Sequence, residues 1–318
     1  MKITVTDATF PALAHERAVA EEFGAEFVEA KCRSADDVTA AADGTDILIV
    51  QFAQVTAEAI AKLAPGSLIV RYGIGLDNID LAAAQARGVK VAYVPDYATG
   101  EVADHTASLI LATLRCLLPL DRSVRDGKWD AVGVAGALQS FTDTTIGFIG
   151  FGRIGQGVLA RLKPFGFRSI VADPYADPST LADLGAEAVN LDTLFARADA
   201  ITLHCPLTPE TRHVVNAERL AAKPGRATLV NTARGGLVDP DALVGALEAG
   251  LLRGAALDVF EAEPLPLDSP LRTCPNLILT PHAAWYSTSA IERLQALAAD
   301  EVRRHLTGAP MRRPAVTG

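Results

Sequence analysis

The chain has 318 residues, of which 49% are apolar and 21% charged, the balance of a globular protein with a large core. Acidic residues outnumber basic ones by 38 to 29, and the net charge of −9 excludes a nucleic-acid-binding protein with a basic face. The four cysteines are dispersed without a CxxC pair, which argues against a zinc site or a disulfide framework and fits a reducing cytoplasm. We therefore expect a cytoplasmic protein with no metal.

Two features of the first 120 residues bear on membrane insertion. Met1–Asp7 is too short and too soon polar for a signal peptide. The longest apolar stretch, Ala107–Leu120, is interrupted by Arg115 and falls short of the roughly 20 residues that span a bilayer. We predict that it forms a buried helix.

Short apolar runs alternate with helical patterns along most of the chain. Several runs are continuously β-branched, as in strands covered by helices on both faces. The alternation predicts an α/β protein with parallel, doubly wound sheets. The predicted strands are Ile3–Thr6, Ile47–Val50, Leu68–Val70, Val89–Tyr93, Thr145–Ile149, Ser169–Ala172, Ala200–His204, Ala227–Asn231, Gly254–Leu257 and Leu277–Leu279.

A glycine-rich turn at Gly150 follows a long β/α stretch, so we expect two domains with the cofactor domain second, and a boundary near Val94–Tyr97. The next helix, Glu101–Arg115, is apolar around most of its circumference, which favours an inter-domain or inter-subunit position. A last helix is expected at Ser287–Leu306, followed by a disordered tail, Arg312–Gly318.

The turn itself reads Gly150-x-Gly152-x-x-Gly155 between a predicted strand and a predicted helix. The first glycine allows a tight turn, the second lets the backbone approach a pyrophosphate, and the third lets helix and strand pack closely. The pyrophosphate would lie on the amides of Arg153 and Ile154 at the helix start. This context predicts a bound dinucleotide.

Asp173 ends the second strand of this unit, about twenty residues beyond the turn, where a carboxylate bonds the adenine ribose hydroxyls. Because a carboxylate repels a 2′-phosphate, we expect NAD in preference to NADP. A surface aspartate before Pro174 is the alternative interpretation.

Hydride transfer to a carbonyl requires a cation for the substrate and a general acid for the nascent alkoxide. His282 follows a strand and a proline turn, and Arg234 and Glu263 also follow strands of the same domain. Since strand ends converge at one crevice, these three residues could meet. On spacing alone, an active site formed by these residues and a structural salt bridge with a capping histidine are equally favoured interpretations.

The other histidines have plainer interpretations. His15, His213 and His305 are expected at the surface, and His105 within the apolar helix is expected to be structural. His204 ends a strand, but its neighbour Cys205 points to the opposite side, which argues against a metal pair. No partner base marks Cys205 as a nucleophile.

Taken together, four motifs resemble the D-isomer-specific 2-hydroxyacid dehydrogenases over nearly the whole chain, with His282–Ser287 closest to the C-terminal-binding-protein branch. The motifs are Gly150-x-Gly152-x-x-Gly155, Asn231–Asp239, Ala256–Pro264 with Glu263, and Thr280-Pro281-His282, and Arg71–Asp80 looks like the family's substrate loop. The resemblance implies a discontinuous, flavodoxin-like substrate domain at residues 1–97 and 289–318, into which a Rossmann NAD-binding domain at 98–288 is inserted. It also implies a homodimer formed through the long helix after the first crossover.

The resemblance assigns roles to the convergent residues. Arg234 would bind the substrate carboxylate and carbonyl. His282 would be the general acid in reduction and the base in oxidation. Glu263 would hold the imidazole, and a nearby anion favours its protonated form.

The resemblance also implies binding residues. Asp258 would bond the nicotinamide carboxamide, Val102 would pack beside its ring, and His204 and Pro206 would line the cofactor cleft, with Thr232 and Ala233. The expected substrate-binding residues are Tyr72, the amides of Gly73, Ile74 and Gly75, and Trp285, which favours larger apolar 2-oxo acids.

Two classes of function stay open. The first is an NAD-dependent enzyme that interconverts a 2-oxo acid and a D-2-hydroxy acid, with phosphoglycerate, glyoxylate or hydroxypyruvate, and phosphite-type or formate oxidation as variants. The second is an NADH-sensing co-repressor or scaffold, against which the short segment after His282 argues.

Overall fold

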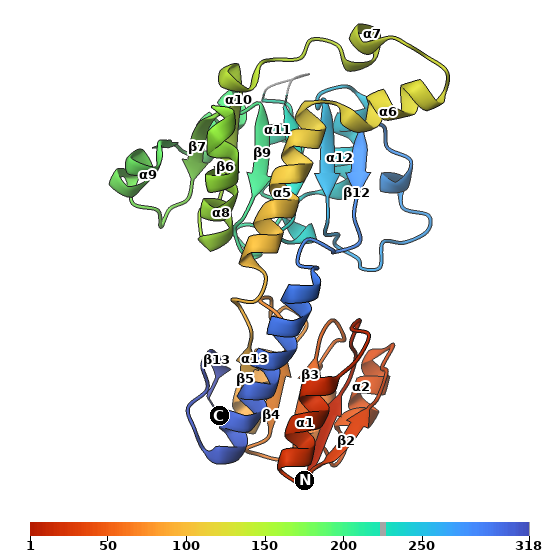
Figure 1. Cartoon of the computed structure of the whole chain (residues 1–318), viewed down its shortest axis with the longest axis vertical. Helices are drawn as coiled ribbons and strands as arrows, with labels where there is room; N and C mark the ends of the chain where they lie inside the picture. Colours follow the sequence, from red (N-terminus) through yellow and green to blue (C-terminus); the bar gives the residue numbers. More distant parts are fainter. Residues whose placement is uncertain (223–226, 318) are drawn as a thin grey trace. The chain divides into compact units, whose positions relative to one another are not determined.

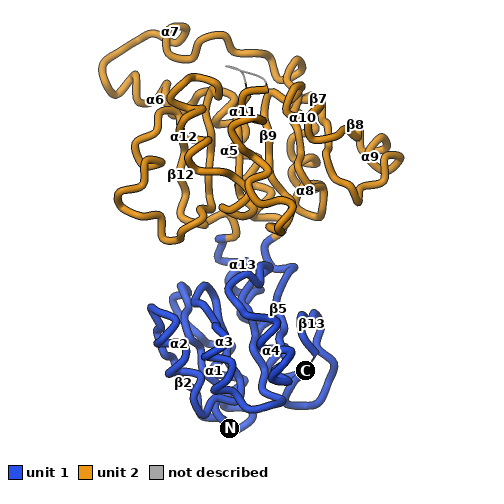
Figure 2. The backbone as a smooth tube through the Cα atoms, turned by 180° about the vertical axis from the view of Figure 1, so that it is seen from behind, with its two compact units in different colours: residues 1–98, 286–318 blue, residues 99–285 orange. Residues whose placement is uncertain are grey.

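The computed structural model describes residues 1–222 and 227–317, which fold into two compact units (Figure 1, Figure 2). Unit 1 comprises residues 1–98 and 286–318, and unit 2 comprises residues 99–285. Each has a mainly parallel sheet with helices on both faces, which confirms the predicted α/β, doubly wound class. Within the described residues, no helix has the length and apolarity that a membrane span requires.

Unit 1 is built on a sheet with the order β2-β1-β3-β4-β5-β13, in which only β13 is antiparallel. The order 2-1-3-4-5 is that of flavodoxin-like sheets. Its elements are β1 (Lys2–Val5), α1 (Ala14–Glu22), β2 (Glu26–Glu29), α2 (Ala35–Ala42), β3 (Ile47–Val50), α3 (Ala57–Lys62), β4 (Leu68–Arg71), α4 (Leu81–Arg87), β5 (Lys90–Tyr93), α13 (Thr288–Thr307) and β13 (Pro314–Val316).

The two central strands of unit 1, β3 and β4, are buried along their whole length, as their continuous apolar runs predict. Helices α2, α3 and α4 contribute Val38, Ile60 and Ala84 to one core layer. Helix α13, capped by the Ser287 hydroxyl, packs along α1 and β4.

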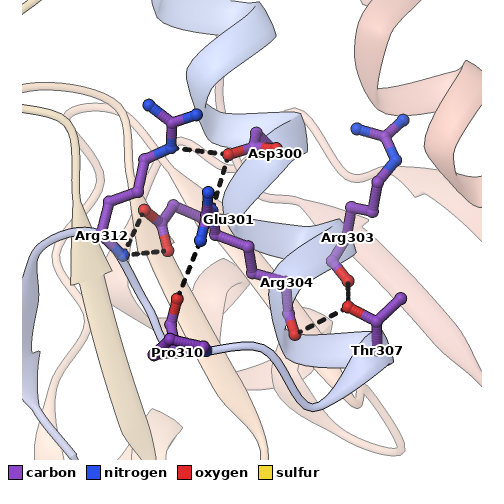
Figure 3. Close-up of polar contacts among 7 residues, drawn as sticks. All are labelled: Asp300, Glu301, Arg303, Arg304, Thr307, Pro310 and Arg312. Atoms are coloured by element: carbon purple, nitrogen blue, oxygen red, sulfur yellow. Dashed lines mark hydrogen bonds and ion pairs between the residues drawn. The ribbon is translucent and has the colours of Figure 1, made fainter.

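The predicted disorder of the tail is wrong for its described part, 312–317, and Gly318 lies outside the described residues. Figure 3 shows why the tail is fixed: Arg312 bonds Asp300 through Nε at 2.7 Å, and its amide donates to Glu301 at 3.0 Å. Arg304 bonds Asp300 and the carbonyl of Pro310. Beyond these contacts, β13 pairs with β5 and buries Val316.

Unit 2 contains a parallel sheet with the order β8-β7-β6-β9-β10-β11-β12, which is the Rossmann order 3-2-1-4-5-6 with one more strand. Its elements are α5 (Thr99–Leu114), α6 (Leu117–Arg125), α7 (Ala131–Ala135), η1 (Phe141–Asp143), β6 (Thr145–Ile149), α8 (Arg153–Leu162), η2 (Lys163–Phe165), β7 (Arg168–Ala172), α9 (Pro178–Leu184), β8 (Ala186–Ala188), α10 (Leu191–Arg197), β9 (Ala200–Leu203), α11 (Ala217–Leu220), β10 (Thr228–Asn231), η3 (Gly235–Leu237), α12 (Pro240–Glu248), β11 (Gly254–Leu257), η4 (Pro270–Arg272) and β12 (Leu277–Leu279).

The apolar stretch Ala107–Leu120 is not one buried helix as predicted. Helix α5 ends at Leu114, Cys116 takes a left-handed conformation (φ 51°), and α6 begins at Leu117, which is exposed. Within unit 2, α5 packs along α8 and across β9, β10 and β11, with Asp104 and Ser108 facing solvent. This packing within unit 2 buries much of the apolar surface of α5.

Three strands that the apolar runs do not predict lie at the edge of a sheet. Strands β2 and β13 are the two edges of the sheet of unit 1, and β8 is an edge of the sheet of unit 2. The sequence of β2 is Glu-Phe-Val-Glu, and none of its residues is fully buried. Edge strands of this kind carry no apolar run.

Candidate active site

The glycine turn joins β6 to α8 at the carboxyl edge of the sheet of unit 2. Gly150 has φ 84°, and a Cβ there would lie 2.5 Å from the backbone nitrogen of Cys205. A Cβ on Gly155 would lie 3.2 Å from the Gly150 carbonyl oxygen, so helix and strand are in close contact. The packing therefore favours glycine at both positions.

Gly152 differs, because a Cβ at this exposed position would meet nothing within 4 Å. It is the N-cap of α8, so the first-turn amides of Arg153 and Ile154 have no acceptor within the helix itself. An unoccluded helix N-terminus at a glycine turn fits the pyrophosphate of a dinucleotide. The chain therefore offers the residues that such a cofactor needs.

Asp173 follows β7 beside this turn. One carboxylate oxygen accepts from the Phe151 amide at 2.7 Å, and the other accepts from the Tyr175 amide at 2.8 Å. These bonds hold the carboxylate in place and tie it to the glycine turn.

His204 and Cys205 continue from β9 and press against Gly150. The His204 ring stacks on Phe148, and its Nε2 lies 3.0 Å from the Thr202 hydroxyl. Burial lowers the pKa of His204 to about 3 and raises that of the Cys205 thiol to about 11. Both groups are neutral at pH 7, so this segment acts through shape rather than charge. Pro206, which follows, accepts a bond from the Thr211 hydroxyl through its carbonyl.

Arg234 follows β10 on a segment fixed by a buried asparagine. Asn231 donates to the Arg234 carbonyl at 2.8 Å and accepts from the Ala233 amide at 3.0 Å. The neighbouring Thr232 bonds Thr106 of α5, whose hydroxyl also contacts the carbonyl of Val102. Val102 is itself buried in α5.

Glu263 and His282 form a direct pair: His282 Nδ1 lies 2.7 Å from Glu263 Oε2. Burial would raise the pKa of the Glu263 carboxyl, but the bond to His282, the charge of His282, the Phe260 amide and the charge of Arg234 together lower it. Arg234, whose charge contributes to this lowering, follows β10, and Glu263 and His282 follow the neighbouring strands β11 and β12, so the three predicted residues lie at one edge of the sheet. Glu263 is ionised at neutral pH.

Asp258 follows β11, and its side chain is 1% exposed. One oxygen accepts from the Thr280 hydroxyl at 2.5 Å and the Ala283 amide at 2.8 Å, and the other accepts from the Ala284 amide at 2.9 Å. These bonds make Asp258 the anchor of the turn that carries His282, and its contact with a nicotinamide carboxamide stays a prediction.

That turn is strained, since His282 has φ 51°, a conformation that non-glycine residues rarely adopt. Its amide donates to the carbonyls of Asp258 and Thr280 at 2.8 and 3.0 Å. His105 supports the turn from α5, with Nε2 3.2 Å from the Thr280 hydroxyl, which agrees with the structural role predicted for it. Trp285, the last residue of unit 2, is largely buried.

In unit 1, the expected substrate loop follows β4. The side chain of Tyr72 is buried and its hydroxyl donates to Glu16 at 2.7 Å, so this side chain holds the start of the loop against α1, and a substrate contact at Tyr72 stays a prediction. The Gly73 amide already donates to the Arg71 carbonyl. Within the part of the chain that the structure describes, the Ile74 and Gly75 amides donate to no protein acceptor.

Sequence reasoning missed the residues that support the pair. Thr106, Asn231 and Thr280 are polar residues within apolar or turn segments, and their spacing gives no signal of the partners they meet. Only a buried polar residue at a strand end, as at Asn231, hints that a hydrogen-bonded turn follows.

The comparisons with known proteins agree with one another. A family model described as the NAD-binding domain of D-isomer-specific 2-hydroxyacid dehydrogenases matches residues 107–284. The D-3-phosphoglycerate dehydrogenase of Methanocaldococcus jannaschii is 39% identical over 312 residues, which are 97% of this chain and 58% of that protein.

Solved structures match the whole fold. A protein from Thermus thermophilus has a TM-score of 0.86 and 35% identity, covering 99% of this chain and 100% of that one. The NAD-dependent formate dehydrogenase of Staphylococcus aureus, solved with NAD, has a TM-score of 0.86 and 32% identity, covering 98% and 97%. The chain spans about half the length of the curated relatives it matches, 58% and 51% for two of them.

Substitutions of the first two glycines of the turn should distinguish an effect on folding from an effect on cofactor binding. Gly152→Ala should leave the melting temperature unchanged, because its Cβ meets nothing, but weaken NADH binding at least about tenfold by blocking backbone approach. Gly150→Ala should lower the melting temperature, because the Cβ overlaps the Cys205 backbone and φ is positive. Thermal unfolding and NADH fluorescence titration measure the two effects. Unchanged NADH affinity in Gly152→Ala would contradict the placement of the pyrophosphate.

Proposed function

Because the chain belongs to the D-isomer-specific 2-hydroxyacid dehydrogenase family, we propose that it is an enzyme that interconverts a 2-oxo acid and a D-2-hydroxy acid. NAD is its cofactor, and when bound it supplies the hydride acceptor of the oxidation. The observation that carries the proposal is the bond between His282 and Glu263 beside Arg234.

The contact with Glu263 supports one nitrogen of His282 as the site of proton exchange. Since His282 Nδ1 faces the Glu263 carboxylate, Nε2 is the nitrogen that gives a proton to the substrate oxygen in reduction and takes it back in oxidation. The ionised Glu263 stabilises the imidazolium and fixes the ring. Arg234 binds the substrate carboxylate and polarises the carbonyl, and the Ile74 and Gly75 amides are further carboxylate donors.

The preference for NAD over NADP rests on Asp173. Its carboxylate lies at the end of β7 and is held by two backbone amides, so it stays fixed where a ribose 2′-phosphate would meet a negative charge. The dispersed cysteines, Cys32, Cys116, Cys205 and Cys274, are free thiols, which supports a cytoplasmic location.

For the substrate, we propose an apolar side chain. Phe52 and Ile74 follow β3 and β4 at the carboxyl edge of the sheet of unit 1 and are 38% and 36% exposed. Arg71 is the basic residue at the start of the expected substrate loop. It is 9% exposed and its Nη1 donates to the Tyr72 carbonyl, so it offers little surface to a phosphate.

We also propose a homodimer. The predicted interface, α5, is largely packed within its own unit, so the exposed apolar residues of the following segment are the better surface. Leu117, Val124, Trp129 and Val132 are 55%, 55%, 92% and 80% exposed, and we call them the α6–α7 face. Large apolar side chains left exposed along one segment of the chain favour an interaction surface there, and a second copy is the partner that the family resemblance implies.

His282→Ala tests the catalytic assignment. We expect turnover to fall by about 10²- to 10⁴-fold, the usual contribution of general acid–base catalysis, with NADH binding unchanged. His15→Ala is the matched control, because His15 pairs with Glu292 at 2.8 Å in unit 1 yet has no role in the reaction. Arg234→Ala should raise KM as well as lower kcat. Near-normal turnover in His282→Ala would refute the proposal.

A substrate panel tests the side-chain preference and the enzyme class together. NADH oxidation with 4-methyl-2-oxopentanoate or phenylpyruvate should exceed that with 3-phosphohydroxypyruvate in kcat/KM by about tenfold or more, since an apolar wall rejects a dianion. Preference for the phosphorylated acid would match the relatives' names and overturn the apolar assignment. NADH binding without turnover on any 2-oxo acid would favour the scaffold function.

Gel filtration with light scattering tests the dimer. The unaltered chain should elute at twice the chain mass, and Trp129→Glu combined with Val132→Glu should give the monomer, because buried carboxylates disfavour an apolar interface. Tyr175→Glu, at a residue 95% exposed in unit 2 but outside the α6–α7 face, is the control and should stay dimeric. A monomeric unaltered chain would rule the interface out.

A further inference from the structure

Glu263 is held at both of its oxygens. Oε2 meets His282 Nδ1, and Oε1 accepts from the Phe260 amide at 2.8 Å. The position of the carboxylate against the imidazole therefore depends on where the backbone of residue 260 lies.

The backbone at 260–261 is pressed onto the segment of Arg234. A Cβ on Gly235 would lie 1.9 Å from the carbonyl carbon of Phe260 and 2.3 Å from the nitrogen of Glu261. No side chain fits between the two strand-end segments, so a displacement of one is transmitted to the other.

A cluster outside the reacting set fixes this backbone. The Glu261 carboxylate accepts from Arg212 Nη2 at 2.9 Å and lies 2.7 Å from His213 Nε2. Arg212 also reaches Gly236, where a Cβ would lie 3.4 Å from its Nη1. The Glu261 carboxylate thus joins the segment after β11 to the loop after β9, and Arg212 of that loop also lies beside the segment after β10.

The backbone that carries this cluster is strained. His213 has φ 50°, and its amide donates to the Gly236 carbonyl at 2.9 Å. The preceding turn is closed by the hydroxyls of Thr208 and Thr211. A non-glycine residue keeps this conformation only where its surroundings hold it there, and such strain gathers at functional sites.

The partners are partly exposed, with Glu261 at 30%, Arg212 at 57% and His213 at 33%. Ion pairs at such exposure add little to global stability. Their effect on a neighbouring backbone is local, and here that backbone carries the amide that holds Glu263.

We propose that Glu261, held by Arg212 and His213, is a positioning residue that fixes the Phe260 amide and through it the contact of Glu263 with His282. This inference rests on the proposed function, since it assumes that His282 exchanges the proton. No member of the cluster contacts the reacting atoms in this role.

The test compares Glu261→Ala with Glu261→Gln, which keeps an acceptor oxygen, and with Glu187→Ala as control. Glu187 forms a similar exposed pair with Arg197 at 2.7 Å elsewhere in unit 2. We expect Glu261→Ala to lower kcat between about 10-fold and 100-fold, as misplacement of a reacting group does, with NADH Kd unchanged. Glu261→Gln should lie nearer the unaltered enzyme, and Glu187→Ala should match it.

Two measurements separate positioning from a general structural effect. With Glu263 displaced, the proton-exchanging group is misplaced but the substrate contacts remain, so Glu261→Ala should lower kcat while the KM for the 2-oxo acid and the melting temperature stay unchanged. The Nδ1 proton resonance of His282, identified by its loss in His282→Ala, should move upfield in the same variant, because its hydrogen bond to Glu263 is weakened.

An unchanged His282 Nδ1 proton resonance in Glu261→Ala would overturn the positioning role, whatever the rate. If the unaltered protein reduces no 2-oxo acid, the proposed function fails, but this resonance still decides whether Glu261 acts on His282. Additive effects of Arg212→Ala and Glu261→Ala on kcat would also contradict a shared contact.

Discussion

A buried carboxylate is the constraint on which the reacting set depends. Asp258 is removed from solvent, and a carboxylate in that position is tolerated only when donors surround it. Three donors do so, and they come from Thr280, Ala283 and Ala284, the residues on either side of His282. Satisfying one buried charge therefore sets the path of the turn and holds His282 in a conformation that it would not take alone.

Parallel strand order then brings the partners together. Arg234, Glu263 and His282 follow β10, β11 and β12, which are consecutive neighbours in the sheet, and the glycine turn follows β6 at the same edge. Since every strand of this sheet runs in one direction, all these side chains arise at one end. The proposed catalytic residues and the cofactor turn lie at the same edge because of the strand topology, although they are far apart in the sequence.

Apolar runs made the central strands predictable, because burial on both faces requires them. The same rule fails at β2, β8 and β13, where an edge strand needs only backbone pairing. The tail was also misjudged for this reason, since Arg312 and Val316 are ordered by contacts with α13 and β5 that local composition does not encode.

The sequence predicts which residues contribute to the candidate site better than it predicts the direction in which their side chains face. The residue pattern alone left Arg234, Glu263 and His282 evenly balanced against a salt bridge, and the family resemblance decided between them. Neither route shows which way a side chain faces. Tyr72 and Asp258 lie where expected along the chain, but both point into the protein, bonded to Glu16 and to the turn of His282.

The opposing effects on the pKa of the Glu263 carboxyl explain why substitutions of Arg234, Glu263 and His282 should affect one another. Burial alone would raise the pKa of its carboxyl, and this is overcome only by the combined effect of His282, the Phe260 amide and Arg234. A carboxyl whose pKa is lowered on folding stabilises the protein above its ordinary pKa, and that contribution is lost as the pH falls through the lowered value. Removing Arg234 withdraws one of the groups that keep Glu263 ionised, so its loss reaches the imidazole as well as its proposed contact with the substrate. Effects of substitutions in this set are therefore expected to be non-additive.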